Sequence, residues 1–324
     1  MKNSKQILHV VTTIDMGGAE KQLLILASEQ VNLGATVTVM PLKGKLELQN
    51  DFTKYGVRVE TTLLDKLPIV QIYLLRKKIR KYVGIIHAHL PRAELVCTFA
   101  GANRNFVVSR HNSEPFFPGA PKFISKVLSR YVTKKAQKII AISNAVKNFI
   151  IQNNEVSYRN RKKIEIIYYG IAQNNIKPLK KLSKKKLNFG TIARISSQKD
   201  YPTLLLGFRY LLNQYPYANL HIVGVGPLEN NMKKYAEKIG ISKNVHWLGK
   251  VRDIQGFLSG IDIFLLTSVY EGFGLVLLEA MAEGLFIVAA NNSSIPEVIG
   301  NEGGKLFRTS DPKDLFKITL QMID

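Results

Sequence analysis

Cysteine is almost absent from this chain, because the 324 residues contain only one, Cys97. A single thiol can form neither an internal disulfide nor a multi-thiolate metal site. Cys97 lies in an apolar run, where we expect a buried core position. Proline is scarce as well, at 12 residues, while 46% of residues are hydrophobic, which excludes a disordered or collagen-like chain. A globular protein is indicated, and its length suggests two domains.

Long hydrophobic runs are also missing. No stretch approaches the roughly 20 apolar residues that a membrane span needs, because acidic residues interrupt the most apolar region, 261–290. The first apolar run, residues 7–11, is too short for the core of a signal peptide and is typical of a first strand. We therefore expect a soluble, intracellular protein.

Acidic residues are few: 24 Asp and Glu stand against 46 Lys and Arg, a net charge of +22. The excess is confined to residues 1–176, which carry +16, and to residues 177–186, which carry +6. Residues 187–324 are neutral overall. A charge of this size suggests nucleic acid or an anionic membrane surface as a partner. Its uneven distribution indicates that the two halves have different functions.

Short β-branched runs alternate with stretches of helical apolar spacing, beginning with a strand at 7–13 and a helix at 20–33. The lysine-rich segment 177–186 interrupts the alternation, which restarts with a strand at 187–192. Such alternation predicts the α/β class, with two doubly wound parallel sheets. The expected organisation is an N-terminal domain at 1–176, a linker at 177–186 and a C-terminal domain at 187–324. Tandem domains of this kind usually bind ligands in the cleft between them.

Residues 270–283 carry the sharpest chemical signal. Glu271 precedes two glycines in a turn, and a helix is expected to begin beside Gly274. Free backbone N–H groups at a helix start attract phosphate or sugar oxygens. Glu279 follows about two helical turns later in an otherwise apolar stretch, where a carboxylate needs partners such as sugar hydroxyls. A plain turn followed by an exposed glutamate explains the same spacing equally well.

Two further loops follow expected strands. Arg194 ends the first strand of the second half, and Lys199 lies in the loop after it, so both cations could hold a diphosphate. Solvated loop cations are the alternative. Gly17 and Gly18 follow the first strand of the chain and would let a ligand approach the backbone closely. The three-glycine spacing of a dinucleotide-binding loop is absent, which argues against a nicotinamide-dependent enzyme.

Together these segments resemble the retaining glycosyltransferases of family 4, which have the GT-B fold of two facing Rossmann-like domains. The resemblance extends from about Lys5 to Phe316. Its most specific parts are the glutamate pair Glu271 and Glu279, with seven residues between them, and the cations Arg194 and Lys199. Supporting matches are Gly17–Glu20, Ser109–Asn112, Ile142–Ser143, Gly224–Pro227, Ser294–Val298 and Gly304.

The resemblance implies a nucleotide-sugar donor that is held mainly by the second domain. Arg194 and Lys199 would neutralise the diphosphate, which activates the nucleotide as a leaving group, and Glu279 would accept hydrogen bonds from the ribose. The transferred sugar would be oriented by Glu271 and by the N–H groups of Phe273, Gly274 and Leu275. Gly17 and Gly18 would approach the donor from the first domain, and His111 would lie near the sugar and the acceptor.

No cofactor and no metal are implied, because the two cations replace a divalent ion. His89 is a weaker candidate for the site. His87 and His89 form a pair, and we expect one of the two to face the cleft. A metal is not expected there without a third ligand. His9 and His221 are expected to be core or surface residues of strands.

Two features depart from the family pattern. The family commonly has Asn-Gly-Val/Ile-Asp after the strand at 164–167, where this chain has Tyr169, Gly170, Ile171 and Ala172. Any polar contact from that loop is therefore in question. Family members also usually continue beyond a helix like the one expected at 312–323. We expect the second domain to lack these last helices, with an exposed apolar patch near the C-terminus and an extended linker.

The basic first half contains two cationic segments, 72–81 and 122–138. The expected helix at 121–138 would align Lys122, Lys126, Arg130, Lys134 and Lys138 in one stripe, with aromatic and aliphatic residues beside it. Such a stripe could bind an anionic membrane surface, although solvated helix faces are the alternative. We therefore expect a peripheral protein on the cytoplasmic face of the membrane.

The sequence thus predicts a metal-independent hexosyl- or N-acetylhexosaminyltransferase. It would move a sugar from a nucleotide-sugar, UDP-sugar by family frequency, to a surface-glycan or lipid-linked acceptor such as lipopolysaccharide. A GT-B sugar-nucleotide epimerase would need no acceptor and is the nearer alternative. A non-enzymatic nucleic-acid-binding protein is disfavoured by the acidic signature and the neutral second half, so no nucleic-acid partner is expected.

Overall fold

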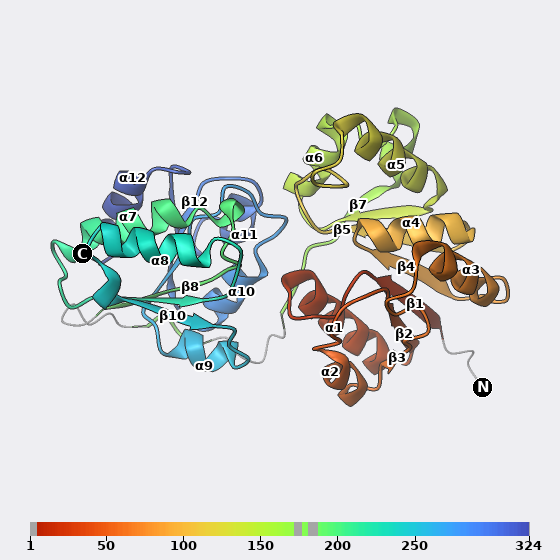
Figure 1. The fold of residues 1–324 in the computed structure, drawn as a ribbon, viewed down its shortest axis with the longest axis horizontal. Helices are drawn as coiled ribbons and strands as arrows, with labels where there is room; N and C mark the ends of the chain where they lie inside the picture. Colours follow the sequence, from red (N-terminus) through yellow and green to blue (C-terminus); the bar gives the residue numbers. More distant parts are fainter. Residues whose placement is uncertain (1–4, 172–176, 181–186, 324) are drawn as a thin grey trace. The chain divides into compact units, whose positions relative to one another are not determined.

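The computed structural model describes residues 5–171, 177–180 and 187–323. The chain divides into two compact units, residues 1–169 and residues 170–324. The division falls seven residues before the boundary that the lysine-rich segment suggested. Each unit is a parallel α/β sheet with helices packed on it, the fold class that the alternation predicts (Figure 1).

Unit 1 contains a seven-stranded sheet in which every pair of neighbours is parallel, in the order β3-β2-β1-β4-β5-β6-β7. The order reverses between β1 and β4, and ligands of doubly wound sheets bind at such a switch point. The strands are β1 (Gln6–Val11), β2 (Thr36–Pro41), β3 (Arg58–Val59), β4 (Ile85–His89), β5 (Phe106–Arg110), β6 (Lys138–Ala141) and β7 (Ile164–Ile166).

The helices of unit 1 form two groups. Helices α1 and α2 pack on each other, and α4 packs on both α3 and α5. Right-handed crossovers place helices on opposite faces when the chain progresses through the sheet in opposite directions. The helices are α1 (Gly18–Asn32), α2 (Gln49–Lys54), α3 (Pro68–Ile79), α4 (Pro91–Ala100), α5 (Lys122–Lys135) and α6 (Asn144–Gln152) (Figure 1). Cys97 of α4 is buried, as expected.

Unit 2 contains a six-stranded parallel sheet in the order β10-β9-β8-β11-β12-β13, which reverses between β8 and β11. The strands are β8 (Asn188–Ile192), β9 (Asn219–Val223), β10 (Val245–Gly249), β11 (Ile263–Leu266), β12 (Phe286–Ala290) and β13 (Lys305–Phe307). The helices are α7 (Tyr201–Leu212), α8 (Glu229–Lys238), α9 (Ile254–Ser259), α10 (Leu275–Ala282), α11 (Ile295–Ile299) and α12 (Pro312–Ile323).

The expected exposed apolar patch near the C-terminus is wrong. Helix α12 packs on α7, β12 and β13, and its Leu315 and Ile323 are buried in the core of unit 2. The other apolar side chains of α12 are partly buried against the same core: Phe316, Ile318, Leu320 and Met322. Gly207 of α7 allows this close packing, because a Cβ at this position would lie 2.6 Å from the side chain of Leu315.

The structure describes residues 177–180 of the predicted linker, where two lysines contact groups of unit 2. The Lys177 ammonium pairs with Glu283 at 2.6 Å, and the Lys180 ammonium donates to the carbonyl oxygens of Ser259 and Ile261, both at 2.6 Å. These contacts satisfy two of the lysines that were expected to repel one another. The rest of the predicted linker, 181–186, lies outside the described residues.

The predicted cationic stripe is shorter than expected. Helix α5 ends at Lys135, and Lys138 lies instead at the start of β6, where it pairs with Glu165 of β7. The second cationic segment, 72–81, begins within α3 and continues past its end at Ile79. Among the described residues, no helix is long and apolar enough to cross a membrane.

Candidate functional site

The switch point of unit 2 brings together two of the predicted site residues. The loop after β8 carries Lys199, at the end of a short 3₁₀ turn, and the loop after β11 carries Glu271. The Lys199 ammonium lies 2.5 Å from Glu271 Oε1, and the side chains are only 16% and 10% exposed. The Ser268 hydroxyl donates to the same oxygen at 2.7 Å. An ion pair of opposite charges thus joins the two loops that flank the switch point.

Backbone contacts hold these two loops in register. The Thr267 hydroxyl donates to the Lys199 carbonyl at 2.8 Å. Gln198 accepts at its carbonyl from the N–H of Val269 and donates from its side chain to the Tyr270 carbonyl, both at 2.8 Å. The hydroxyl of Ser293 donates to the Glu271 carbonyl at 2.7 Å. These contacts fix both loops, so the side chains of Lys199 and Glu271 are held in place at the switch point.

Arg194 differs from Lys199 because its side chain is exposed and forms no ion pair with another described residue. Its loop is buttressed by the glycines that follow β9. A Cβ on Gly224 would lie 2.1 Å from the Ala193 carbonyl, and one on Gly226 would lie 2.2 Å from the Ile195 carbonyl. The two glycines therefore allow the β9 loop to pack directly under the Arg194 loop, a role that the sequence pattern alone did not indicate.

Helix α10 begins at the same switch point. Gly274 precedes its first residue with φ +85°, the left-handed region that favours glycine. Phe273 and Leu275 on either side are buried, and Glu279 is half-buried on the second turn. The predicted turn and helix start are therefore present. The N–H groups at this end belong to the positive pole of the helix dipole.

The first loop of unit 1 holds the predicted glycines at the N-terminus of α1. A Cβ on Gly17 would lie 2.3 Å from the carboxylate of Glu20, whereas a Cβ on Gly18 would meet nothing within 4 Å. The Thr13 hydroxyl donates to Glu20 at 2.7 Å, and burial raises the pKa of that carboxyl. Gly18 therefore leaves open space, while Gly17 packs against its own helix.

A chain of side-chain hydrogen bonds crosses the switch point of unit 1. His89 Nδ1 lies 3.2 Å from His111 Nε2, and His89 Nε2 lies 2.9 Å from His9 Nδ1. At one end, His9 Nε2 lies 2.7 Å from the side-chain oxygen Oε1 of Gln30. At the other end, His111 Nδ1 contacts the Tyr169 hydroxyl. The loop whose polar contacts were in question therefore does supply one, through Tyr169.

Burial lowers the pKa of these histidines, to about 4 for His9 and about 4 for His111, where the nearby Arg110 charge adds to the effect. The pKa values of His87 and His89 are also lowered well below their usual value by burial. Four neutral imidazoles result. Both His87 and His89 are buried, and as alternate residues of β4 they lie on the same face of the sheet.

The direction of these hydrogen bonds follows from the acceptor at their end, the side-chain oxygen of Gln30. Because the Gln30 oxygen only accepts, His9 Nε2 carries a proton and His9 Nδ1 accepts from His89. His89 Nδ1 then accepts from His111, whose Nδ1 accepts from the Tyr169 hydroxyl. The orientation of the His111 ring and the position of its proton are thus set by residues far from it in sequence.

Tyr169→Phe is expected to remove the only donor to His111 Nδ1 in this chain of bonds while keeping the ring of residue 169. If His111 contacts the sugar, the rate of transfer should fall about tenfold, because losing one hydrogen bond costs about 1 kcal/mol or more. Steady-state kinetics and the melting temperature check this. Transfer equal to that of the wild-type protein would show that Tyr169 does not position His111.

Arg110 holds the end of β5 immediately before His111. Its guanidinium is buried between two carboxylates, 3.0 Å from Glu94 and 3.1 Å from Glu155. It also donates to the Ser129 hydroxyl at 3.1 Å and lies over the Phe116 ring at 4.3 Å. The sequence indicated Arg110 only as part of a matching segment, because neither acid is near it in sequence.

The chain matches two family models, Glycosyltransferase Family 4 over residues 16–174 and Glycosyl transferases group 1 over residues 172–324. Together the matches extend from residue 16 to the last residue. The chain therefore belongs to the family 4, group 1 glycosyltransferases, as the sequence motifs indicated.

Solved structures match over nearly the whole chain. HepE of Anabaena, in complex with UDP and glucose, superposes with a TM-score of 0.82 at 20% identity, over 99% of this chain and 90% of that one. The lipopolysaccharide outer core galactosyltransferase WaaB gives a TM-score of 0.70 at 18% identity, over 98% and 90%. These likenesses show the fold alone, which is of the predicted GT-B class.

Curated relatives match at low identity. An Escherichia coli UDP-Gal:alpha-D-GlcNAc-diphosphoundecaprenol alpha-1,3-galactosyltransferase is 25% identical over 80% of this chain and 71% of its own length. The gpi3 subunit of a Schizosaccharomyces pombe phosphatidylinositol N-acetylglucosaminyltransferase is 24% identical over 87% and 65%. An uncharacterized glycosyltransferase of Haemophilus influenzae is 36% identical over 37% and 34%. The chain thus spans between about a third and two thirds of the first three curated relatives.

Proposed function

We propose that this protein transfers a sugar from a UDP-sugar to a lipid-linked acceptor with retention of the anomeric configuration. The observation that carries the proposal is the Lys199–Glu271 pair, which joins the two switch-point loops of unit 2 beside the exposed Arg194. An ammonium has three N–H donors, so Lys199 can bind a phosphate oxygen while it remains paired with Glu271. Cations placed at the diphosphate stabilise the charge that develops on the leaving nucleotide.

The base and the acceptor are argued from the relatives. HepE is solved with UDP-glucose as well as with UDP and glucose, and the Escherichia coli relative is named for UDP-Gal, which supports UDP as the carrier. The names of two relatives include a lipid, diphosphoundecaprenol in one and phosphatidylinositol in the other. A sugar or alcohol on a lipid anchor is therefore the acceptor class that we propose for this chain.

Nucleotide binding can be measured as a shift in the unfolding of unit 2. The fluorescence of Trp247, the only tryptophan of the chain, follows this unfolding because the residue lies on β10 of unit 2. UDP at 100 times its dissociation constant should raise the free energy of unfolding of unit 2 by about 2.7 kcal/mol. GDP and ADP at the same concentration should have smaller effects. The absence of a shift with all three nucleotides would overturn the donor assignment. Conversion of the UDP-sugar to an epimer without an acceptor would favour the epimerase.

Glu279→Ala is expected mainly to raise the KM for the donor, because contacts to the ribose are made equally in the ground state and the transition state. The side chain is half-buried on α10, one to two turns beyond Gly274. Glu237→Ala, at an exposed position of α8, is the matched control. A large fall in kcat with an unchanged KM would contradict the ribose assignment.

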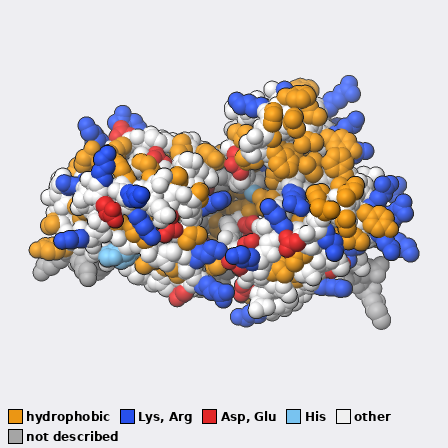
Figure 2. Space-filling view, in the orientation of Figure 1, with side chains coloured by type: hydrophobic (Ala, Val, Ile, Leu, Met, Phe, Trp, Pro, Cys, Tyr) orange, Lys and Arg blue, Asp and Glu red, His pale blue; other side chains and the backbone are white. Residues whose placement is uncertain are grey.

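We also propose that unit 1 docks on an anionic membrane surface through α5. The helix is inverted relative to an ordinary surface helix: its buried residues include Ser125, Ser129 and Thr133. Most of its large apolar side chains face solvent instead, with Phe123 73% exposed and Val127 51% exposed, while Val132 is buried. Figure 2 shows hydrophobic side chains gathered over this part of unit 1, with lysines and arginines at their edges.

This surface combines the two components of interfacial binding, apolar insertion and cationic attraction. The exposed apolar residues continue from α5 onto neighbouring helices, because Phe99 of α4 packs on Tyr131 with ring centroids 5.6 Å apart. On α3, Ile69 and Tyr73 are exposed as well. Exposed cations of the predicted segments accompany them: Arg76, Lys77, Arg80, Lys81, Lys122, Arg130, Lys134 and Lys135.

Four cations of α5 can be replaced by glutamine without breaking a described contact: Lys122, Lys126, Lys134 and Lys135. At about 1 kcal/mol for each cation, binding to anionic vesicles should weaken by about three orders of magnitude, while UDP binding stays unchanged. The control replaces four exposed lysines of unit 2, namely Lys234, Lys238, Lys243 and Lys317. Co-sedimentation measures both, and equal loss in the two variants would show nonspecific charge rather than docking through α5.

A further inference from the structure

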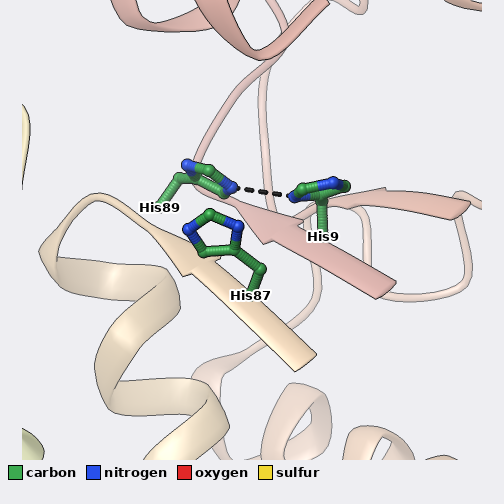
Figure 3. Close-up of side chains that lie close together, drawn as sticks. All are labelled: His9, His87 and His89. Atoms are coloured by element: carbon green, nitrogen blue, oxygen red, sulfur yellow. Dashed lines mark hydrogen bonds between the residues drawn. The ribbon is translucent and has the colours of Figure 1, made fainter. Parts of the chain in front are cut away.

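Three buried histidines meet on one face of the sheet of unit 1. His87 and His89 are alternate residues of β4, and His9 of β1 is the register partner of His87. Each offers a ring nitrogen, and these three atoms all lie within 4.8 Å of one another. Figure 3 shows the three rings turned toward a common centre. The third histidine of this group is therefore His9, which precedes His89 by 80 residues in the sequence.

The outer nitrogens of these rings are all engaged. His9 Nε2 lies 2.7 Å from the side-chain oxygen Oε1 of Gln30, and His87 Nε2 lies 2.7 Å from the Ser109 hydroxyl. His89 Nδ1 lies 3.2 Å from His111. The inner nitrogens are then Nδ1 of His9, Nδ1 of His87 and Nε2 of His89. An outer partner for every ring is the arrangement that orients histidines around a metal ion.

One of the spacings between the inner nitrogens is close to the spacing of the ligands of a small ion. Zinc bonded to imidazole at 2.0–2.1 Å in a tetrahedron requires about 3.3 Å between ligand nitrogens. His9 Nδ1 and His89 Nε2 lie 2.9 Å apart, within a few tenths of an ångström of this value, and the ligand nitrogen of His87 lies within 4.8 Å of both. Three imidazoles with no carboxylate select zinc, cobalt, nickel or copper over magnesium or calcium.

We propose that His9, His87 and His89 form a binding site for a divalent transition-metal ion of the zinc class, with water as the fourth ligand. The ion would clamp β1 to β4 at the switch point of unit 1. It would play no part at the diphosphate, whose cations lie in unit 2. The inference does not depend on the proposed transfer reaction.

The ion would also move the proton of His111. Once His89 Nε2 binds metal, its proton is on Nδ1 and is donated to His111 Nε2. His111 must then carry its own proton on Nδ1 and donate it to the Tyr169 oxygen. This is the reverse of the metal-free direction, in which Tyr169 donates to His111. Metal occupancy thus selects the tautomer of His111.

Cobalt(II) tests the site directly, because tetrahedral cobalt absorbs in the visible range. Full-length protein is first treated with a chelator and then titrated with cobalt(II) chloride. One equivalent should bind with tetrahedral absorption, and His87→Gln should abolish that signal. The matched control is His246→Gln, because exposed His246 stacks on His221 with centroids 4.8 Å apart and could bind metal at the surface. Loss of the signal only in the control would assign the metal to that surface pair and overturn the proposal.

Two further measurements guard against a variant that fails to fold. Ser109→Ala keeps all three ligands but removes the outer partner of His87, and it should weaken cobalt binding about 10- to 100-fold. X-ray absorption of the zinc-loaded wild-type protein should show three imidazole nitrogens at 2.0–2.1 Å. Fewer than three imidazoles, or less than one equivalent bound by the wild-type protein, would overturn the proposal.

Discussion

Arg194→Ala and Lys199→Ala are both expected to slow transfer by about 10²-fold or more, but only the second should lower the melting temperature. Each substitution removes a cation from the proposed diphosphate site, and losing one donor to developing charge costs about 3 kcal/mol in the transition state. Arg194 is exposed and unpaired with any described acid, so its removal leaves the fold intact. Steady-state kinetics and thermal unfolding of each variant measure the two effects separately.

Lys199→Ala destabilises because it leaves the Glu271 carboxylate, 10% exposed, without its cation. We expect a loss of about 1–3 kcal/mol in the free energy of unfolding of unit 2. The double variant Lys199→Ala with Glu271→Gln removes both charges and should recover much of the stability but none of the activity. This cycle separates the structural contribution of the ion pair from its contribution to transfer.

Lys317→Ala, at an exposed position of α12, controls for the loss of a positive charge from unit 2. It should change neither kinetics nor stability. Normal transfer by both Arg194→Ala and Lys199→Ala would eliminate the diphosphate assignment. Recovery of activity in the double variant would instead show that Lys199 acts only by holding Glu271.

The places of Arg194, Lys199 and Glu271 in the fold could be predicted from the sequence because the rule that places them is local. Chemistry-bearing residues that follow parallel strands lie at the carboxyl edge of the sheet. Arg194 and Lys199 follow β8, and Glu271 follows β11, so each could be assigned to that edge separately. That β8 and β11 are neighbours required only the usual order of a doubly wound sheet.

The histidine cluster could not be predicted in the same way. Placing His9 beside His87 requires β1 to pair with β4 in one particular register. A shift of one residue would turn His9 to the opposite face of the sheet. Spacing within β4 alone showed only two histidines, which is why no third ligand was expected.

The orientation of α5 was hidden for a different reason. Its aromatic and aliphatic residues have the spacing of an ordinary core face, yet Phe123 and Val127 face solvent. The buried face carries Ser129 because its hydroxyl bonds to Arg110 and to the Glu155 carbonyl. A buried ionic network needs small polar neighbours. The sequence of α5 alone does not indicate this network, because Arg110 and Glu155 lie outside the helix.

That network makes unit 1 sensitive to pH. Glu94 and Glu155 share the single guanidinium of Arg110, so both carboxyls cannot ionise without a net buried negative charge. Burial raises the pKa of Glu94 to about 7, and the Glu155 charge adds to the rise while Arg110 opposes it. The folded state therefore holds a proton on Glu94 over a range in which the unfolded chain has released it.

Glu94→Gln is accordingly expected to stabilise unit 1 at pH 8 and to have little effect near pH 4.5. The pKa of Glu94 is higher in the folded state than in the unfolded chain, so protonation of this carboxyl stabilises the fold. This stabilisation is complete below about pH 4.5 and is lost as the pH rises through about 7. A difference of about 2.5 units corresponds to on the order of 3 kcal/mol. Glutamine mimics the protonated acid at every pH, so the variant should lack this loss.

Urea unfolding followed by far-ultraviolet circular dichroism at pH 5, 6.5 and 8 measures the difference between wild-type protein and variant. Trp247 fluorescence, which reports on unit 2, should show no difference between them at any pH. The control is Glu29→Gln, at an exposed position of α1 in the same unit, which should give a constant small effect. If Glu94→Gln destabilises unit 1 equally at all three pH values, Glu94 is ionised in the fold and acts as an ordinary ion-pair partner of Arg110.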